Sequence, residues 1–277
     1  MTKHKPDAEF IRELSKALDG VTFSQAAQKI TAIFKRDSLD TPALDARLLV
    51  CRACKLSEVD LVVEGARHLS YDQRKTLAKM VGLRLARMPI SRIVNLREFY
   101  GLSFRLSKHT LDPRPDSETL VEAILGKARL KKERLTLLDL GTGSGCLLLA
   151  LLAQLPQATG LGVDRSAGAL RTARLNAGLN GLFERARFRQ SSWFSHITER
   201  YDFILSNPPY IPAGDVSGLA PEVKDYDPYK ALVADENGLG DFRRIVSQAS
   251  DYLKPGGWLG FEVGAGQDLE VARIFKN

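Results

Sequence analysis

Cysteine is scarce in this sequence, with three residues in a chain of 277: Cys51, Cys54 and Cys146. An odd and low number argues against a disulfide framework and is typical of a reducing compartment. Cys51 and Cys54 form a C-x-x-C pair, but a zinc site would need a second pair or nearby histidines, and neither is present. Both fall within an apolar helical pattern, so we interpret them as small core residues and expect no metal site.

Long apolar runs are also missing. The most apolar stretch, residues 147–155, is far shorter than the roughly 20 residues that a membrane-spanning helix needs. The first ten residues are polar and lack the apolar segment of a signal peptide. We therefore expect a soluble, cytoplasmic protein with no membrane partner.

The overall composition is that of an ordinary globular protein, with 44% hydrophobic and 26% charged residues. The length allows one large domain or two of unequal size. The net charge of +7 permits contact with nucleic acid, but basic residues spread along the chain are more simply explained as solvated surface. We expect a monomer without a stable nucleic-acid partner.

The first part of the chain, residues 1–88, is predicted to be a small all-α domain that docks a partner. Ser24 is a candidate N-cap for a helix over residues 25–35, and Pro42 suits the first turn of a second helix. Residues 71–88 show a third helical pattern. The region contains no glycine-rich loop and no cluster of catalytic residue types.

Residues 89–112 are rich in β-branched and aromatic side chains and are predicted to be an extended β-hairpin linker, with Gly101 at its turn. Strand and helix patterns then alternate through residues 113–277. Such alternation predicts the α/β class, with a Rossmann-like, mostly parallel sheet that carries helices on both faces.

A glycine-rich loop directly follows the first buried strand, with Gly141, Gly143 and Gly145 preceded by Asp139. A dinucleotide fingerprint would need glycine at Cys146, and a phosphate loop would end in Gly-Lys-Ser/Thr, so both are excluded. The remaining G-x-G-x-G pattern resembles the S-adenosylmethionine loop of class I methyltransferases. We therefore expect S-adenosylmethionine as cofactor.

Asp164 ends the second predicted strand, 25 residues after Asp139. A carboxylate at this strand end can accept hydrogen bonds from both ribose hydroxyls of a nucleoside. The alternative is that Asp164 only caps the next helix. The glycine loop upstream favours the cofactor role.

The fourth predicted strand ends in the sequence Asn207-Pro208-Pro209-Tyr210. Two prolines remove backbone donors at the end of a buried strand, but they give a rigid backbone whose carbonyls can face a pocket. An amide or aromatic amine nitrogen is a weak nucleophile, so a site can position it with two acceptors, the Asn207 side-chain oxygen and the Pro208 carbonyl. Tyr210 offers a flat face to a planar group. A simple turn is the alternative interpretation, and the position of the motif after the cofactor loop argues against it.

The sequence resembles the protein-glutamine N5-methyltransferases that modify peptide chain release factors, the HemK/PrmC family. The segments that carry the resemblance are EFYGLSF (98–104), PRPDSE (113–118), DLGTGSG (139–145), SSWF (191–194), NPPYI (207–211) and ALVADENGL (231–239). The resemblance implies a class I methyltransferase that acts in translation termination, on the glutamine of a Gly-Gly-Gln loop.

The resemblance also implies a set of site residues. Catalysis would fall to Asn207, Pro208 and Tyr210, with Pro209 completing the substrate contacts. The cofactor contacts would be Asp139, Gly141, Thr142, Gly143, Gly145, Asp164, Trp193 and Asn207. Further pocket-lining candidates are Arg114, Glu118 and Phe104.

Three departures from the family pattern stand out. Asp112 replaces an aliphatic residue, and Ser192 replaces an aspartate before the Trp-Phe pair, where the family offers an acidic contact to adenine. The family continues after the fifth strand with a helix and an antiparallel strand pair, and the final strands are expected to be missing from this chain.

Two other functions remain open from the sequence. A nucleic-acid methyltransferase acting on adenine N6 or guanine N2 would share the cofactor loop and the Asn-Pro-Pro-Tyr motif. A non-catalytic binding protein could retain the same fold, although it would have no use for that motif.

Overall fold

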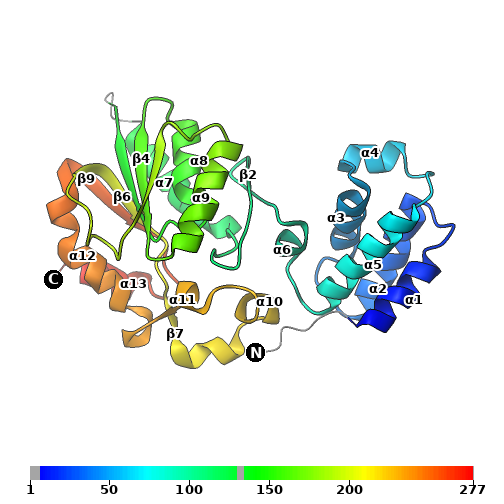
Figure 1. Cartoon of the computed structure of the whole chain (residues 1–277). Helices are drawn as coiled ribbons and strands as arrows, with labels where there is room; N and C mark the ends of the chain where they lie inside the picture. The colour runs from blue at the N-terminus through cyan, green and yellow to red at the C-terminus, as the bar shows by residue number, and fades with distance from the viewer. Residues whose placement is uncertain (1–6, 130–133, 277) are drawn as a thin grey trace. The chain divides into compact units, whose positions relative to one another are not determined.

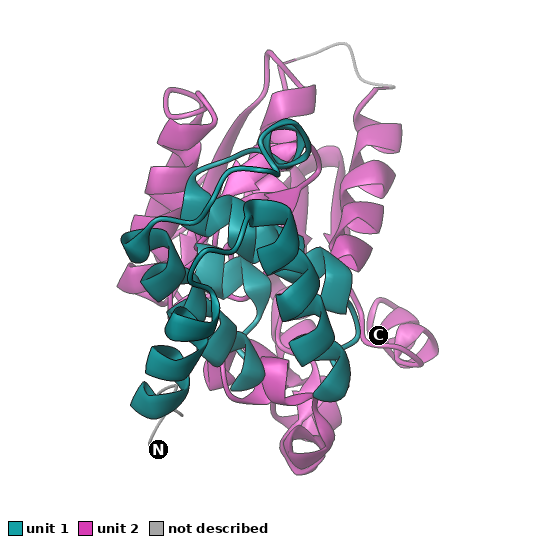
Figure 2. Ribbon diagram, turned by 90° about the vertical axis from the view of Figure 1, so that its right-hand side faces the viewer, with its two compact units in different colours: residues 1–94 teal, residues 95–277 magenta. Residues whose placement is uncertain are grey.

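The computed structural model describes residues 7–129 and 134–276 of the chain, which forms two compact units, Met1–Val94 and Asn95–Asn277 (Figure 1, Figure 2). The predicted helical and catalytic domains each include residues outside the described ones, at 1–6, 130–133 and 277. In the part of the chain that is described, no helix is both long and apolar enough to cross a membrane.

The first unit consists of helices around one apolar core. They are α1 (Ala8–Ala17), α2 (Phe23–Arg36), α3 (Pro42–Cys54), α4 (Glu58–Val63), α5 (Tyr71–Leu85) and α6 (Ile90–Val94). Phe23, Phe34 and Leu49 are among its fully buried side chains. The prediction of Pro42 at the first helical position is confirmed.

The N-cap of α2 is Thr22, so the prediction of Ser24 is wrong. The Thr22 side chain accepts from the backbone N–H of Gln25, and the Gln25 side chain returns a bond to the Thr22 N–H. This reciprocal pair satisfies two donors that the first helical turn leaves open. Ser24 cannot form it, because no Glu or Gln stands three residues later.

The prediction that the chain is extended from residue 89 is also wrong at its start. Ile90–Val94 is the helix α6, whose first turn is closed by the N–H groups of Arg92 and Ile93 donating to the Pro89 carbonyl at 3.0 and 3.1 Å. Ile90, Ile93 and Val94 recur at helical spacing and pack against the core of the first unit. Burial of this face outweighs the strand preference of β-branched residues.

The C-x-x-C pair lies inside the same core, as interpreted from the sequence. Cys51 and Cys54 are buried free thiols at the end of α3. Burial raises the pKa of Cys54 to about 11, which makes the thiolate form scarce at neutral pH.

The second unit opens with a hairpin and is built on a central parallel sheet. Its elements up to the fourth sheet strand are β1 (Arg97–Phe99), β2 (Leu102–Phe104), η1 (Pro115–Ser117), α7 (Glu118–Ala128), β3 (Thr136–Leu140), α8 (Cys146–Gln154), β4 (Thr159–Asp164), α9 (Ala167–Leu179), β5 (Ala186–Gln190) and β6 (Tyr201–Ser206). The remaining elements are β7 (Ile211–Pro212), η2 (Ala213–Gly218), α10 (Pro221–Lys224), α11 (Tyr229–Leu232), β8 (Val233–Ala234), η3 (Glu236–Gly238), α12 (Gly240–Tyr252), β9 (Leu253–Phe261) and α13 (Asp268–Ile274).

The central sheet has the order β5-β4-β3-β6-β9, and all neighbouring strands are parallel. Helices α7, α8 and α9 lie on one side of it and α12 on the other (Figure 1). Side chains alternate accordingly, with Leu137 and Phe203 in the first core and Leu138 and Ile204 in the second. The chain reverses its direction of winding between β3 and β6, and open parallel sheets bind ligands at such a point.

Candidate active site

The loop after β3 is shaped by glycines in the left-handed conformation. Gly141, Gly143 and Gly145 have φ values of 72°, 55° and 82°, a region that residues with a Cβ rarely adopt. The backbone N–H groups of Gly141 and Thr142 both donate to the Val163 carbonyl at 2.9 Å. The loop is thereby fixed against β4 at the carboxyl end of the sheet.

Asp139 and Gly145 shape this loop. The sequence predicted that both would contact the cofactor, but neither lines the adjoining cavity. Thr142 Oγ1 donates to Asp139 Oδ2 at 2.6 Å, and burial raises the pKa of Asp139 to about 7. A Cβ on Gly145 would come within 3.2 Å of Leu149 Cδ1 and 3.3 Å of Ala173 Cβ. Glycine at this position therefore allows α8 to pack closely against α9.

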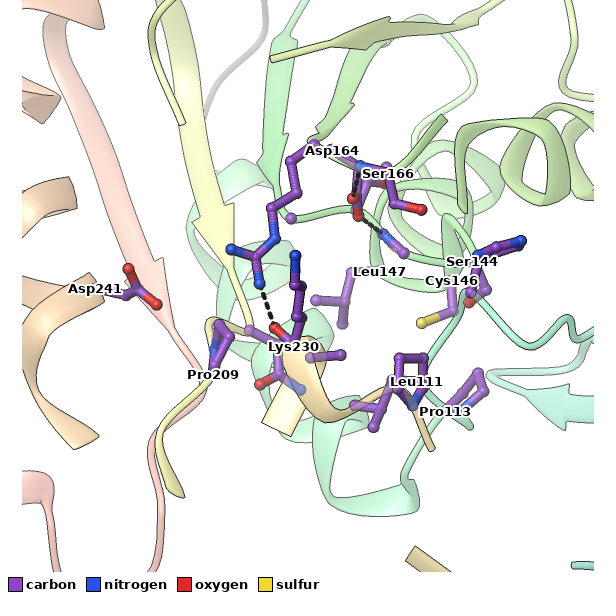
Figure 3. A pocket seen from close by; sticks show the side chains of 18 of the residues that line it. Leu111, Pro113, Ser144, Cys146, Leu147, Asp164, Ser166, Pro209, Lys230 and Asp241 are labelled. Atoms are coloured by element: carbon purple, nitrogen blue, oxygen red, sulfur yellow. Dashed lines mark hydrogen bonds between the residues drawn. The ribbon is translucent and has the colours of Figure 1, made fainter. Parts of the chain in front are cut away.

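Asp164 ends β4 and faces the glycine loop (Figure 3). Its Oδ2 accepts from the Gly143 N–H at 3.0 Å and its Oδ1 from the Ser166 N–H at 2.8 Å. Burial raises the pKa of Asp164, and these two hydrogen bonds oppose the rise. The N-cap of α9 is Ser166, so Asp164 supports the start of this helix only through the Ser166 N–H. Each carboxylate oxygen retains a lone pair for a further donor.

A cavity of about 550 Å³ opens at the carboxyl ends of β3, β4 and β6 (Figure 3). This volume is within the range of roughly 300–1,000 Å³ found for small-molecule sites. The predicted site residues that line it are Arg114, Gly141, Thr142, Gly143, Asp164, Trp193, Asn207 and Pro209. Residues from five separate segments of the sequence therefore meet around one space.

Trp193 closes the cavity beside the glycine loop, and its backbone also has a positive φ of 49°. A Cβ built on Gly141 would lie 3.6 Å from Trp193 Cζ3, so the ring covers the loop. The Trp193 side chain hydrogen-bonds to Asp241, whose pKa is raised by burial. Ser192, which stands where the resemblance predicts an acid, lines the same cavity.

The Asn207–Tyr210 segment begins at the residue after β6. Asn207 lines both the large cavity and a smaller one of about 260 Å³, and Tyr210 lines only the smaller one. Pro208 lines neither. The rest of the smaller cavity is formed by Leu111, Arg114, Ile211, Val223, Ala231 and Leu232. Asn207 is thus placed where a cofactor-sized space meets a small, largely apolar one.

Tyr210 is held in place from two sides. Its carbonyl accepts from Gln267 Nε2 at 3.1 Å. Gly238, with φ 89°, approaches so closely that a Cβ would lie 2.2 Å from the same carbonyl. Burial raises the pKa of the Tyr210 phenol, so the ring remains neutral and can only offer its face or its hydroxyl.

The three further pocket candidates have different positions. Arg114 lines both cavities and forms an ion pair with Asp227 at 2.6 Å. Phe104 lies fully buried in the core of the second unit, because strand alternation turns it away from the cavities. Glu118 Oε1 accepts from the Tyr100 N–H at 3.0 Å. Phe104 and Glu118 therefore support the hairpin, and neither lines either of these two cavities.

Several residues of the site have no motif that would have pointed to them. Arg165, Lys230 and Asp241 line the large cavity, and Arg165 Nη2 donates to the Lys230 carbonyl at 2.6 Å (Figure 3). Arg165 directly follows Asp164 and could have been included for that reason. A helix beginning near Asp241 was predicted and is present as α12, but no pattern indicated that Asp241 or Lys230 would line the cavity. Glu262, the residue after β9, hydrogen-bonds with the Asn207 side chain.

Comparison with known proteins gives two family-model matches, to the PrmC N-terminal domain over residues 25–94 and to the Methyltransferase small domain over residues 106–220. A release factor glutamine methyltransferase of Agrobacterium fabrum is 43% identical over 239 residues, which are 85% of this chain and 83% of the relative. One of Bradyrhizobium diazoefficiens is 40% identical over 263 residues, which are 94% and 89%.

Among solved structures, the catalytic domain of hMettl16, in complex with a 3′UTR hairpin, matches with a TM-score of 0.51 and 20% identity. The match covers 70% of this chain and 73% of that chain. At this identity the similarity concerns the fold alone. The second unit has the class I methyltransferase fold, which confirms the predicted fold class.

Proposed function

The chain belongs to the release factor glutamine methyltransferase family, and we propose that it methylates the N5 nitrogen of the glutamine in the Gly-Gly-Gln loop of peptide chain release factors. Enzymes of this family use S-adenosylmethionine. The observation that carries the proposal is the position of Asn207 at the junction of the two cavities.

The larger cavity fits S-adenosylmethionine in size and in donor set. Asp164 offers two carboxylate oxygens with free lone pairs, which suit the two ribose hydroxyls. Gly141 has no side chain opposite the Trp193 ring. Its absence leaves room for a flat or extended ligand. When bound, S-adenosylmethionine supplies an electrophilic methyl group on a positively charged sulfur.

The smaller cavity suits the glutamine side chain. Its wall is largely apolar, apart from Asn207, Arg114 and Tyr210. An uncharged side chain preceded by two glycines can enter such a space without desolvating a charge. The helical unit, which matches the PrmC N-terminal domain model, is proposed to dock the release factor.

The chemistry follows from positioning. Asn207 Oδ1 accepts one N–H of the glutamine amide. The Pro208 carbonyl would accept the other, although Pro208 lines neither cavity in this structure and only its neighbours Asn207 and Pro209 do, so this contact requires the substrate to reach the backbone between them. Two acceptors direct the nitrogen lone pair at the methyl group. Tyr210 supports the plane of the amide. No strong base is needed beforehand, because the nitrogen becomes acidic once it is methylated and then loses its proton.

The test is a transfer assay with methyl-labelled S-adenosylmethionine and, in separate reactions, a purified bacterial release factor, total tRNA and rRNA, and plasmid DNA. We expect label in the release factor, lost when the glutamine of its Gly-Gly-Gln loop is replaced. Label only in nucleic acid would refute the proposed substrate while retaining the cofactor.

Asn207→Ala separates the chemistry from cofactor binding in the same assay. Because it removes an acceptor for the substrate amide, we expect transfer to be abolished while calorimetry shows cofactor binding that is only weakened. Undiminished transfer by this variant would refute the role of Asn207.

A further inference from the structure

Glu262 and Asn207 are neighbours because of strand register. β6 and β9 are parallel, with Ser206 paired to Phe261. The pairing continues one step further, since the Glu262 N–H donates to the Ser206 carbonyl at 3.1 Å. Asn207 and Glu262 are therefore the next residues on two adjacent strands, both at the carboxyl end of the sheet.

The Glu262 carboxyl group is buried and forms few hydrogen bonds. It bonds with the side chains of Ser117 and Asn207. Its Oε2 is buried and has no hydrogen-bond partner among the residues that the structure describes. Within the described part of the chain, no backbone N–H donates to this carboxyl group, in contrast to Asp164 with its two. Structural packing alone gives no reason to place a carboxylic acid here, because burying one is costly.

The chemistry of the two groups decides how the Asn207 amide is oriented. A carboxylate can only accept hydrogen bonds, whereas an asparagine amide has its donors on Nδ2 and its acceptor on Oδ1. The bond between Asn207 and ionised Glu262 must therefore use Nδ2, which leaves Oδ1 at the other end of the amide plane. We propose that Glu262 is a positioning residue: by accepting from Asn207 Nδ2, it turns Asn207 Oδ1 toward the substrate nitrogen.

This inference rests on the proposed function, which gives Oδ1 the role of accepting a substrate N–H. Without Glu262, the amide could rotate by half a turn and present Nδ2 to the substrate. A donor would then face a donor, and the reacting nitrogen would be misaligned.

Protonation of Glu262 would also leave the orientation of the Asn207 amide unfixed, because a carboxylic acid can donate a hydrogen bond to Oδ1 as well as accept one from Nδ2. The charged and titratable groups around it are Arg114 and Asp116, and also Tyr210 and Cys146, which feel its charge. Burial, reinforced by Asp116, raises the pKa of Glu262, while its two hydrogen bonds and Arg114 oppose this. We therefore expect turnover to fall as the pH drops through this raised pKa, and the fall to be absent in Glu262→Gln.

The experiment compares wild type, Glu262→Ala, Glu262→Gln and a surface control, Glu184→Gln. Glu184 is exposed and precedes β5, at the amino end of the sheet and away from the site. For Glu262→Ala we expect kcat with the release factor to fall about ten- to hundredfold, with KM and the cofactor Kd changed by less than about threefold. Glu262→Gln keeps an acceptor and should retain more activity than Glu262→Ala. Glu184→Gln should match wild type.

A kcat for Glu262→Ala equal to that of Glu184→Gln would overturn the inference. So would a loss of cofactor affinity as large as the loss of turnover, because Glu262 would then be serving the cofactor or the fold. If the wild-type protein labels no release factor, the proposed function fails. The role of Glu262 can then still be tested by NMR without substrate. The Asn207 side-chain amide signals in NMR, identified by their absence in Asn207→Ala, should move with pH in wild type and stay fixed in Glu262→Gln. Signals that titrate equally in both would refute the bond.

Discussion

Replacing Asp164 by asparagine tests how the cofactor cavity recognises its ligand. The carboxylate of Asp164 accepts from the N–H groups of Gly143 and Ser166, one on each oxygen. Asparagine has nearly the same size, but it offers one oxygen in place of two. The Nδ2 group, a hydrogen-bond donor, would then point at one of these backbone N–H groups, which is also a donor. It could no longer accept a hydrogen bond from the ribose hydroxyl on that side.

The magnitude follows from those contacts. A hydrogen bond to a charged acceptor contributes roughly 1.5–3 kcal/mol. Asp164→Asn loses one acceptor for the ribose and weakens the other by removing the charge, so we expect a loss of about 3 kcal/mol in cofactor binding. That corresponds to an increase in Kd of roughly a hundredfold.

The assay is calorimetric titration with S-adenosylhomocysteine, with the unfolding midpoint measured in parallel. Asp251→Asn is the matched control, because Asp251 is exposed near the end of α12 and lines neither cavity. A Kd for Asp164→Asn within about threefold of the control would refute the assignment of Asp164 to the ribose, since the expected loss is far larger.

Three further predictions concern stability. Asp139 has its pKa raised to about 7 by burial, so its contribution to folding is full below about pH 4 and is lost as the pH rises to about 7. The unfolding free energy of Asp139→Asn relative to wild type should therefore increase over this interval, by up to about 4 kcal/mol, and level off above it; a difference independent of pH would contradict this. Arg114→Ala leaves the buried Asp227 carboxylate without its 2.6 Å partner, so denaturant titration should show a loss of about 1–3 kcal/mol, since Arg114 is partly exposed. Adding Asp227→Asn should recover part of that loss, and strict additivity would argue against the pair. Phe104→Ala should cost about 3–5 kcal/mol without changing cofactor affinity, and a parallel change in Kd would place Phe104 at the site after all.

The parts of the site that could be predicted are contiguous in sequence and lie at strand ends. The fourth predicted strand is present as β6, Tyr201–Ser206, and the Asn-Pro-Pro-Tyr segment follows it directly. The glycine loop also follows a predicted strand, and Asp164 is the last residue of another. Because parallel strands bring their carboxyl ends to one edge, the predicted pattern alone was enough to gather these residues.

The errors arose where two local interpretations compete. Thr22 and Ser24 are both good N-caps by residue type, and only the reciprocal bond with Gln25 decides between them. Ile90–Val94 has strand-forming residues, but its helical face is buried by the core of the first unit. Such choices depend on tertiary contacts, which no local pattern contains.

The residues that were missed depend on non-local pairing. Glu262 reaches Asn207 only because β9 pairs with β6 in a register that includes an irregularity between Tyr201 and Phe203. A shift of one residue would turn the Glu262 side chain to the other face of the sheet. Sequence alone cannot fix that register.

Asp164 and Glu262 show how two carboxyl groups at one sheet edge can serve different purposes. Burial raises the pKa of both. Asp164 is held by two backbone donors and faces the large cavity, so it is suited to bind hydroxyl groups of a ligand. Glu262 contacts the side chain that faces the substrate. A base that removed a proton from an amide before methylation would have to overcome the low acidity of that nitrogen, whereas the methylated nitrogen loses its proton readily. A carboxylate in this position is therefore more effective at orienting Asn207 than at acting as a general base. Substitutions of Glu262 should lower turnover to the extent that they change the orientation of the Asn207 amide.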